Sequence, residues 1–256
     1  MILTDERWRD LLHTRATNPG AIRQAYATRK RRPHLLSDQG TLFLVAADHP
    51  ARGALSVGED PLAMADRRTL LERLLVALAN PAVDGILGTP DIVEELLLLG
   101  ALHDKVVFGS MNPDVGFTGY DARTLVDCGL DGGKLLLRLA DTAPTLQACA
   151  DAVTELAAYG LVAMIELPED PASPARAVTI ASGLGTTSAH TWLKLPPTSS
   201  AAVLGATTLP VVLDGVPPER LLAHPVVRGL VMSPTQLGGN AEAAVEAAAK
   251  VLEDAK

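Results

Sequence analysis

Eight short apolar runs, separated by longer amphipathic stretches, are the feature of this sequence that most constrains its fold. Each run has the length of a buried strand, and the stretch between two runs leaves room for a helix. A parallel strand can rejoin its sheet only through such a crossover, so the alternation predicts successive strand–helix units. The predicted strands are Thr41–Ala47, Val83–Gly88, Lys105–Ser110, Lys134–Leu139, Leu161–Leu167, Thr191–Leu195, Leu209–Asp214 and Gly229–Met232.

The alternation predicts the α/β class and, within it, a single (β/α)8 TIM barrel over residues 1–256. A chain of 256 residues with 48% hydrophobic content can build one large core of this kind. An open doubly wound sheet is the alternative, but no GxGxxG turn follows the first predicted strand. An extra N-terminal helix, Asp5–Lys30, is expected within a helical extension over residues 1–40. Later helices are expected at Pro61–Asn80, Thr145–Tyr159 and Ala241–Leu252.

The charge of the chain narrows the classes of partner. A formal net charge of -8 argues against nucleic acid, because binding to phosphates rests on clustered lysines and arginines. The basic run Arg29–Arg32 is interpreted as a solvated face. The sequence has neither a signal-like N-terminus nor an apolar run of membrane length, so we expect a cytoplasmic protein without a membrane partner. The LLLLGAL run and the Ala-rich final helix suggest a homo-oligomer.

Two of the six lysines, Lys134 and Lys194, stand inside apolar strand sequences. An unpaired buried ammonium is costly, so such a lysine either pairs with a carboxylate or becomes neutral through a lowered pKa. Side chains of one interior barrel layer come from alternate strands, so lysines on the fourth and sixth strands are expected to face each other. We therefore expect Lys134 to lower the pKa of Lys194 and to prepare it as a nucleophile.

Two carboxylates are expected at the same rim of the barrel. Glu166 ends the fifth predicted strand and could pair with Lys134 or carry protons, and Asp48 ends the first. As alternatives, Lys134 could begin its strand and reach solvent, and both acids could be helix N-caps. A metal site that joins them to His49 and His190 ranks lower, because no HxH or HExxH spacing is present.

Further side chains near the strand ends are candidates for binding substrate. Arg138 could bind an anion at the rim, or it could pair with Asp131 or Asp141. Trp192 could form a wall of the pocket, although a buried Trp is more often part of the core. Asn112 could bind a substrate hydroxyl or cap the short helix that follows. The remaining candidates for substrate binding are His49, Gly215 and Ser233.

The motifs AADHPARG, DGGKLLLRL, MIELP and TWLKLP together resemble the class I, Schiff-base-forming aldolase superfamily of the DhnA, LacD and deoxyribose-phosphate aldolase type. The resemblance is closest to actinobacterial deoxyribose-phosphate aldolase-like (β/α)8 proteins and runs from Thr41 to Met232. By analogy with the LacD kind, it implies that Lys194 forms a Schiff base without a cofactor or a metal. The catalytic residues that it implies are Asp48, Lys134, Glu166 and Lys194.

The resemblance implies a lyase that cleaves a small ketose, sugar-acid or cyclitol-derived carbonyl substrate, with or without a phosphate. Phosphate-binding members usually carry Gly-rich turns after the seventh and eighth strands, often with Gly-Arg, whereas these turns here read Asp214-Gly215 and Ser233-Pro234-Thr235. The seventh strand also lacks the second lysine of deoxyribose-phosphate aldolases proper. An imine-forming dehydratase, isomerase or transaldolase-like enzyme is the second hypothesis. A degenerate barrel that binds or regulates is the third.

Overall fold

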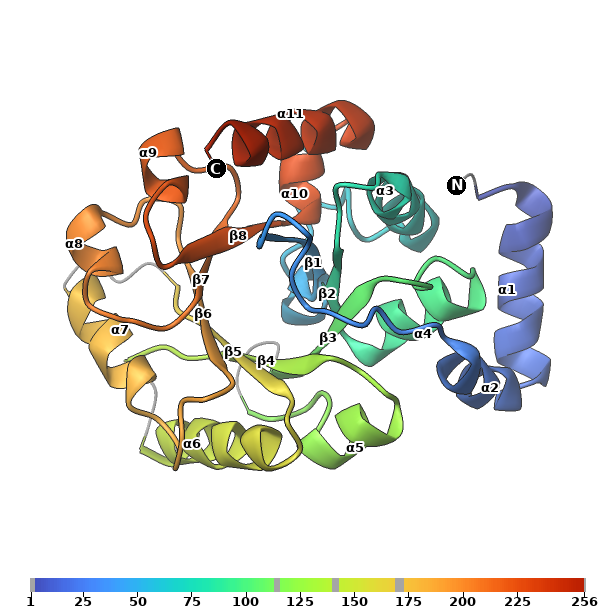
Figure 1. The fold of residues 1–256 in the computed structure, drawn as a ribbon. Coiled ribbons are helices and arrows are strands. Elements are labelled where there is room, and N and C mark those ends of the chain that lie inside the picture. Colours follow the sequence, from blue (N-terminus) through green and yellow to red (C-terminus); the bar gives the residue numbers. More distant parts are fainter. Residues whose placement is uncertain (1–2, 113–115, 140–142, 169–172, 256) are drawn as a thin grey trace.

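The strands form a closed parallel barrel, which confirms the predicted (β/α)8 fold over the open sheet. The computed structural model describes residues 3–112, 116–139, 143–168 and 173–255. Each strand pairs with the next along the chain, and the last pairs with the first (Figure 1). The strands are β1 Leu42–Ala47, β2 Gly85–Gly88, β3 Val106–Asn112, β4 Gly132–Leu136, β5 Val162–Glu166, β6 Thr191–Leu195, β7 Val211–Asp214 and β8 Val227–Met232.

Helices connect the strands and cover the outside of the barrel (Figure 1). The helix predicted from Pro61 begins instead at Arg67, because the Asp66 side chain accepts a hydrogen bond from the backbone N–H of Thr69 at 2.7 Å and caps it there. The connecting helices are η1 His49–Arg52, α3 Arg67–Ala79, α4 Pro90–Leu98, α5 Ala122–Asp127, α6 Ala143–Ala158, α7 Pro174–Ser182, α8 Ala201–Leu204 and α9 Glu219–Leu222. Two helices, α10 Pro234–Leu237 and α11 Ala241–Asp254, follow the last strand.

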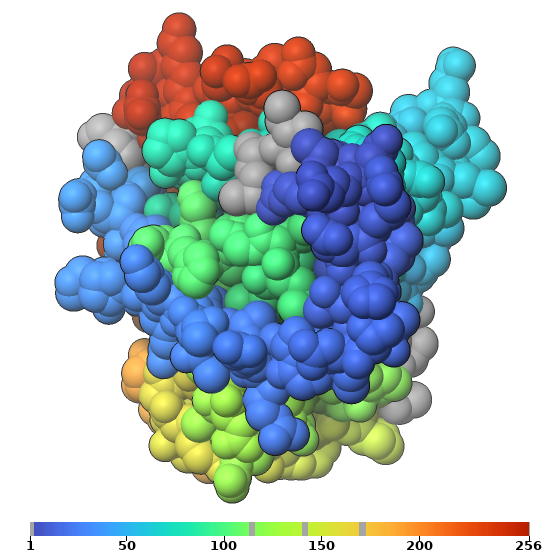
Figure 2. All heavy atoms as spheres, turned by 90° about the vertical axis from the view of Figure 1, so that its right-hand side faces the viewer, coloured from blue at the N-terminus to red at the C-terminus, as the bar shows by residue number. Residues whose placement is uncertain are grey.

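The N-terminal segment contains two helices, α1 Asp5–Thr17 and α2 Gly20–Thr28, where one was predicted. Pro19 disfavours the helical conformation of the residue before it, and Asn18 accordingly has φ -138° and ψ 69°. Figure 2 shows this segment, in blue, spread over one side of the barrel. The Arg7 guanidinium donates to the Leu99 carbonyl at 2.8 Å. The segment is therefore packed on the barrel. That residues 1–256 form one domain stays a prediction.

The basic run after α2 lies at the N-terminal ends of the strands. Its interpretation as a solvated face holds for Lys30 and Arg31, which are exposed, but is wrong for Arg29 and Arg32. The Arg29 side chain is 1% exposed and donates to the carbonyl oxygens of Lys105 and Gly129 at 2.8 and 2.5 Å. Arg32 pairs with the buried Asp84, which precedes β2. The arginines satisfy backbone and carboxylate acceptors there, so this end of the barrel serves stability.

The barrel interior is apolar toward the N-terminal ends of the strands and polar toward their C-terminal ends. Its apolar part is a buried cluster of Leu42, Leu44, Leu87, Phe108, Met164, Trp192, Val212 and Val231 with their neighbours. Successive side chains of a strand alternate between the inside and the outside of the barrel. The same alternation brings Lys134, Glu166 and Lys194 inward at the C-terminal end, where the sites of barrel enzymes lie.

Four leucines of the LLLLGAL run, Leu96, Leu97, Leu99 and Leu102, are buried within the chain itself. The run therefore packs against the rest of the chain and does not form an exposed apolar surface. It gives no support to a homo-oligomer, which stays a prediction. Across the described ranges, none of the helices combines the length and the apolar character that crossing a membrane requires.

Candidate active site

Lys134 is the middle residue of β4 and is fully buried, which excludes the alternative that it begins its strand and reaches solvent. The strand was predicted to start at Lys134 but starts at Gly132. The two preceding glycines, Gly132 and Gly133, pair with Val162 and Ala163 of β5. A Cβ at Gly132 would lie 2.5 Å from the Val162 carbonyl oxygen and 2.6 Å from the ring of Phe108. The missing side chain of Gly132 allows the neighbouring strands to pack closely. Because β4 begins at this glycine, Lys134 lies two residues inside the strand.

The Lys134 ammonium joins two carboxylates. Its Nζ lies 2.7 Å from Asp48 Oδ2 and 2.5 Å from Glu166 Oε2. Asp48 is fully buried and also accepts a hydrogen bond from the Ser110 hydroxyl at 3.2 Å. The structure thus makes Asp48 an internal partner of Lys134. Asp48 also occupies the N-cap position of η1, but its side chain makes no capping hydrogen bond there, and the N-cap of α7, the helix after Glu166, is Ser173.

Lys194 lies on β6 beside Glu166 in the strand register and is 1% exposed. Its Nζ is 2.9 Å from Asp214 Oδ2 and 3.2 Å from Glu166 Oε1. Glu166 therefore stands between the two lysines that were predicted to face each other, with one carboxylate oxygen toward each. The result is a row of alternating charges, Asp48, Lys134, Glu166, Lys194 and Asp214.

The alternating charges set the protonation states of the row. Burial alone would raise the pKa of Glu166, but Lys134, Lys194 and Arg52 hold it well below its usual range. Burial likewise opposes the charge of Asp48, and Lys134 keeps the pKa of that carboxyl lowered. Burial would lower the pKa of Lys194, but Glu166 and Asp214 raise it above its usual value. The prediction that Lys134 lowers the pKa of Lys194 is therefore wrong, because Glu166 lies between them.

Lys194 opens into a pocket of about 300 Å³ at the C-terminal end of the barrel. Glu166 and Asp214 share its lining with Lys194, and two arginines complete the ionisable part of the wall. The described residues that line it are Arg52, Leu136, Arg138, Glu166, Leu167, Pro168, Lys194, Leu195, Pro196, Pro197 and Asp214. Lys194 thus belongs to the wall of a cavity large enough for a small molecule, although its Nζ is itself buried.

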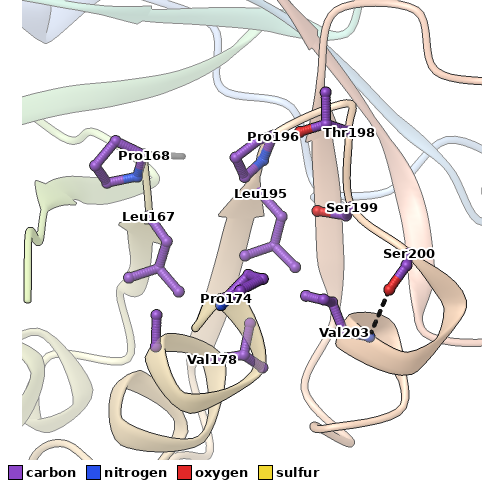
Figure 3. Close-up of a pocket in the computed structure, with 11 residues that line it drawn as sticks. Leu167, Pro168, Pro174, Val178, Leu195, Pro196, Thr198, Ser199, Ser200 and Val203 are labelled. Carbon is purple, nitrogen blue, oxygen red and sulfur yellow. Dashed lines mark hydrogen bonds between the residues drawn. The ribbon is translucent and has the colours of Figure 1, made fainter. Parts of the chain in front are cut away.

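A second pocket, of about 320 Å³, adjoins the first between α7, β6 and α8 (Figure 3). Leu167 and Leu195 belong to the walls of both pockets. The described lining of the second pocket offers hydrocarbon and hydroxyl groups but no ionisable side chain. The Ser200 hydroxyl, for example, accepts a hydrogen bond from the backbone N–H of Val203 (Figure 3) and caps α8. Of these two pockets, only the first therefore has described side chains that can act as acids or bases.

Two of the residues predicted to bind substrate, Arg138 and Asn112, occupy different places. Arg138 lines the pocket. Its alternative partner Asp131 binds Arg29 and Arg31 before β4, at the opposite end of that strand, and Asp141 lies outside the described residues. Asn112 is buried and exchanges two hydrogen bonds of 2.7 Å with the backbone of Leu136. Its amide thereby bridges β3 and β4 across a shift in their register.

Four other candidates lie away from the pocket lining. Trp192, 8% exposed, belongs to the apolar interior cluster below Lys194. His49 Nδ1 lies 3.6 Å from Asp48 Oδ1, and burial lowers the pKa of His49. Gly215 has φ +70°, and Ser233 forms a capping box with Gln236 at the start of α10. Their substrate-binding roles stay predictions.

The alternative metal site lacks its second histidine. His190 precedes β6 at the N-terminal end of the barrel, whereas Asp48 and His49 follow β1 at the other end. Within the ranges that the structure describes, no three His, Cys, Asp or Glu side chains gather into a group able to hold a metal ion.

Two pocket residues were missed by the sequence reasoning. Asp214 was noted as the end of the seventh strand but was given no role, although a carboxylate that closes a buried strand is the same signal that pointed to Glu166. Arg52 lies in the AADHPARG motif, four residues after Asp48, and reaches the pocket from η1. Its Nη2 is 3.7 Å from Glu166 Oε1. No pattern in the sequence indicates that reach, because it depends on the turn after β1.

Comparison with solved structures places this geometry among related folds. Cgl0159 from Corynebacterium glutamicum matches over 99% of each chain, with 39% identity and a TM-score of 0.91. A Schiff-base-forming fructose-1,6-bisphosphate aldolase matches over 90% of this chain and 99% of its own, with 14% identity and a TM-score of 0.62. Fructose-bisphosphate aldolase from Slackia heliotrinireducens matches over 84% and 82%, with 16% identity and a TM-score of 0.63.

At these identities the two aldolases share the fold with this chain and no more. A search of curated protein sequences found no significant match. The Cgl0159-like family model matches residues 40–250, a range that holds all eight strands and every charged residue of the pocket. The chain belongs to the Cgl0159-like family.

Proposed function

We propose that this protein is a class I aldolase in which Lys194 forms a Schiff base with a small carbonyl substrate. The observation that carries the proposal is the Lys194 ammonium, 1% exposed in the wall of a pocket, with Asp214 and Glu166 within 3.2 Å. Imine formation needs a lysine with adjacent proton acceptors, and this pair supplies them. The fold shared with fructose-bisphosphate aldolases is compatible with the proposal, although barrels support many reactions.

The first stage is formation of the imine. Because carboxylates raise the pKa of Lys194, its ammonium must first give up a proton, and Asp214 is the nearer acceptor at 2.9 Å. The neutral amine adds to the carbonyl carbon and forms a C–N bond, while the carbonyl oxygen takes the proton back from Asp214. The adduct nitrogen then loses a proton to Asp214, which passes it to the departing hydroxyl. Water leaves, and the protonated imine and the Asp214 carboxylate remain.

The second stage is cleavage of the carbon–carbon bond beside the imine. Glu166 lines the pocket and Asp48 does not, so Glu166 is placed to take the proton of the substrate hydroxyl. As that proton moves, the bond breaks, an aldehyde forms, and the electron pair passes to the imine nitrogen to give an enamine. Protonation of the enamine carbon and hydrolysis of the imine release the second product. Lys134, held by Asp48, keeps Glu166 ionised and orients it.

The other two hypotheses differ from this one in identifiable ways. A dehydratase, isomerase or transaldolase-like enzyme would form the same imine but would release a different product. A barrel that only binds or regulates would have no need for Lys134, Glu166 and Lys194 together. The closer likeness to actinobacterial deoxyribose-phosphate aldolase-like proteins, the cytoplasmic location and the identity of the carbonyl substrate stay predictions.

Borohydride trapping tests the proposal. The protein is treated with sodium borohydride and a panel of small aldehydes, ketones and sugar phosphates, and its intact mass is measured. A reduced adduct that maps to the peptide of Lys194 is expected, and Lys194→Met should abolish it. Lys105→Met is the matched control, because Lys105 is also partly buried but lies before β3, at the opposite end of the barrel, and should leave the adduct unchanged.

The outcomes separate the hypotheses. Absence of an adduct with every carbonyl compound, or an adduct that persists in Lys194→Met, would reject Schiff-base chemistry at this site. An adduct at Lys194 accompanied by dehydration or isomerisation, without carbon–carbon cleavage in either direction, would favour the second enzyme class over an aldolase.

A further inference from the structure

Arg52 presents a guanidinium to the pocket, where its ion-pair partner is the Glu166 carboxylate. Its side chain is 15% exposed, and the 3.7 Å between its Nη2 and Glu166 Oε1 is longer than a hydrogen bond. Among the described residues, Arg52 donates no hydrogen bond to the protein. A guanidinium carries five N–H donors in a planar fork, and an anionic group that enters the pocket can accept from them.

Arg138 lines the same pocket from the end of β4, so two guanidinium-bearing side chains share a cavity of about 300 Å³ with Lys194. Within the described part of the lining, three cationic side chains, Arg52, Arg138 and Lys194, stand beside two carboxylates, although the chain as a whole carries a formal net charge of -8. Cationic side chains that share a small cavity attract an anion to it.

The turns after β7 and β8, where related barrels hold phosphate, are already engaged within the chain. A Cβ on Gly215 would lie 2.4 Å from the Gln236 side chain, and that side chain accepts a hydrogen bond from the backbone N–H of Ser233 at 2.7 Å. The Ser233 side chain caps α10. The backbone N–H of Gly215 also donates to the Val231 carbonyl at 2.7 Å, so the N–H groups of Gly215 and Ser233 already have partners within the chain. Among the described residues of the pocket lining, Arg52 offers donors that no hydrogen bond within the chain uses.

We propose that Arg52, together with Arg138, forms an anion subsite, and that the substrate of Lys194 is a small carbonyl compound with a carboxylate or phosphate group. The inference rests on the proposed Schiff-base function and specifies its substrate class. A guanidinium fork matches either oxyanion through two parallel hydrogen bonds. A neutral ketose would leave the donors of Arg52 unpaired, which is the physical basis for discrimination against it.

Trapping with matched carbonyl pairs tests the subsite. One pair is pyruvate and its neutral amide, and the other is dihydroxyacetone phosphate and dihydroxyacetone. The concentration that gives half-maximal borohydride trapping at Lys194 is measured for each compound. At least a tenfold lower value is expected for the anionic member of one pair, and the pair that shows it tells whether the group is a carboxylate or a phosphate. Arg52→Gln should reduce that ratio toward one.

Two further variants make the test specific. Arg52→Lys keeps the charge but lacks the fork, so it should retain only part of the preference. Arg123→Gln is the control, because Arg123 is 73% exposed on α5, where it pairs with Asp127, and it should keep the full ratio. A loss of the preference in this control would point to a general effect of charge instead of a subsite.

The two proposals can fail separately. Equal trapping of the charged and neutral members by the unmodified protein would overturn the subsite and leave the Schiff-base function standing. No trapping at all would overturn the function, and calorimetric titration with inorganic phosphate and with acetate then decides the subsite. Binding of either anion that Arg52→Gln weakens at least tenfold would support it, and no binding of either anion would overturn it.

Discussion

Replacing Lys134 by Met tests the charge network at its most buried point. Lys134 and Asp48 are fully buried, and the ammonium lies within 2.7 Å of two carboxylates. Removing one partner of a buried ion pair leaves an uncompensated charge and costs about 3–5 kcal/mol. For a chain of this size, about 2–4 °C is lost per kcal/mol, so the melting temperature should fall by roughly 6–20 °C at pH 8.

The pH dependence of the same variant has an opposite sign to that of the unmodified protein. In the unmodified protein, the pKa values of Asp48 and Glu166 are lowered on folding, so their stabilisation is present above the unfolded values, near 4, and is lost as the pH falls through the folded values. Without Lys134, burial and the charge of Glu166 should raise the pKa of Asp48 above its unfolded value. The folded variant then takes up a proton, and its deficit should shrink between pH 8 and pH 5.5.

The assay is urea unfolding followed by circular dichroism and Trp fluorescence at pH 5.5 and 8. Lys105→Met is the control, because its Nζ donates to the carbonyl oxygens of Val83 and Asn80, and no carboxylate pair depends on it. The control should lose about 1 kcal/mol of its free energy of unfolding, and this loss should be the same at pH 5.5 and pH 8. A loss below about 1 kcal/mol in Lys134→Met, or a deficit that grows on acidification, would refute the reasoning.

Three further predictions concern the active site and its frame. Asp214→Asn should retain the fold but slow borohydride trapping at Lys194 by about 10²–10⁴-fold, as expected for a lost proton acceptor; an unchanged rate in a stopped-time assay would assign that proton to another group. Gly85→Ala should unfold or aggregate the protein in thermal melts and size-exclusion runs, because its Cβ would lie 1.9 Å from the Val106 carbonyl oxygen; a melt like that of the parent would contradict the close packing. Arg29→Met should cost about 2–4 kcal/mol in urea unfolding, because it removes charged hydrogen bonds from a buried position; a loss under about 0.5 kcal/mol would return this residue to the solvated face.

The pattern of apolar and ionisable residues in the sequence predicted the barrel and four members of its charged row, Asp48, Lys134, Glu166 and Lys194, but not Asp214 or the approach of Arg52. Apolar runs at strand length, separated by amphipathic stretches, favour a parallel sheet whose strands are covered by helices, and the absence of a GxGxxG turn favoured the barrel over the open sheet. The parity of residues within a strand also determines which side chains point inward, so Lys134, Glu166 and Lys194 could be recognised as costly ionisable groups in apolar strands. Periodicity was a poorer guide at the N-terminus, because it predicted one continuous helix where Pro19 separates two.

Tertiary structure decided how the charges meet. The sequence by itself determines that Lys134 and Lys194 point into the barrel, but the register between β5 and β6 places Glu166 between them and so reverses the expected direction of the Lys194 pKa shift. Closure of the barrel likewise brings Asp214 to within 2.9 Å of Lys194, and the turn after β1 brings Arg52 into the same pocket. Distances between side chains across a closed barrel depend on strand register and on the conformation of the turns. Neither of these produces a periodic signal in the sequence.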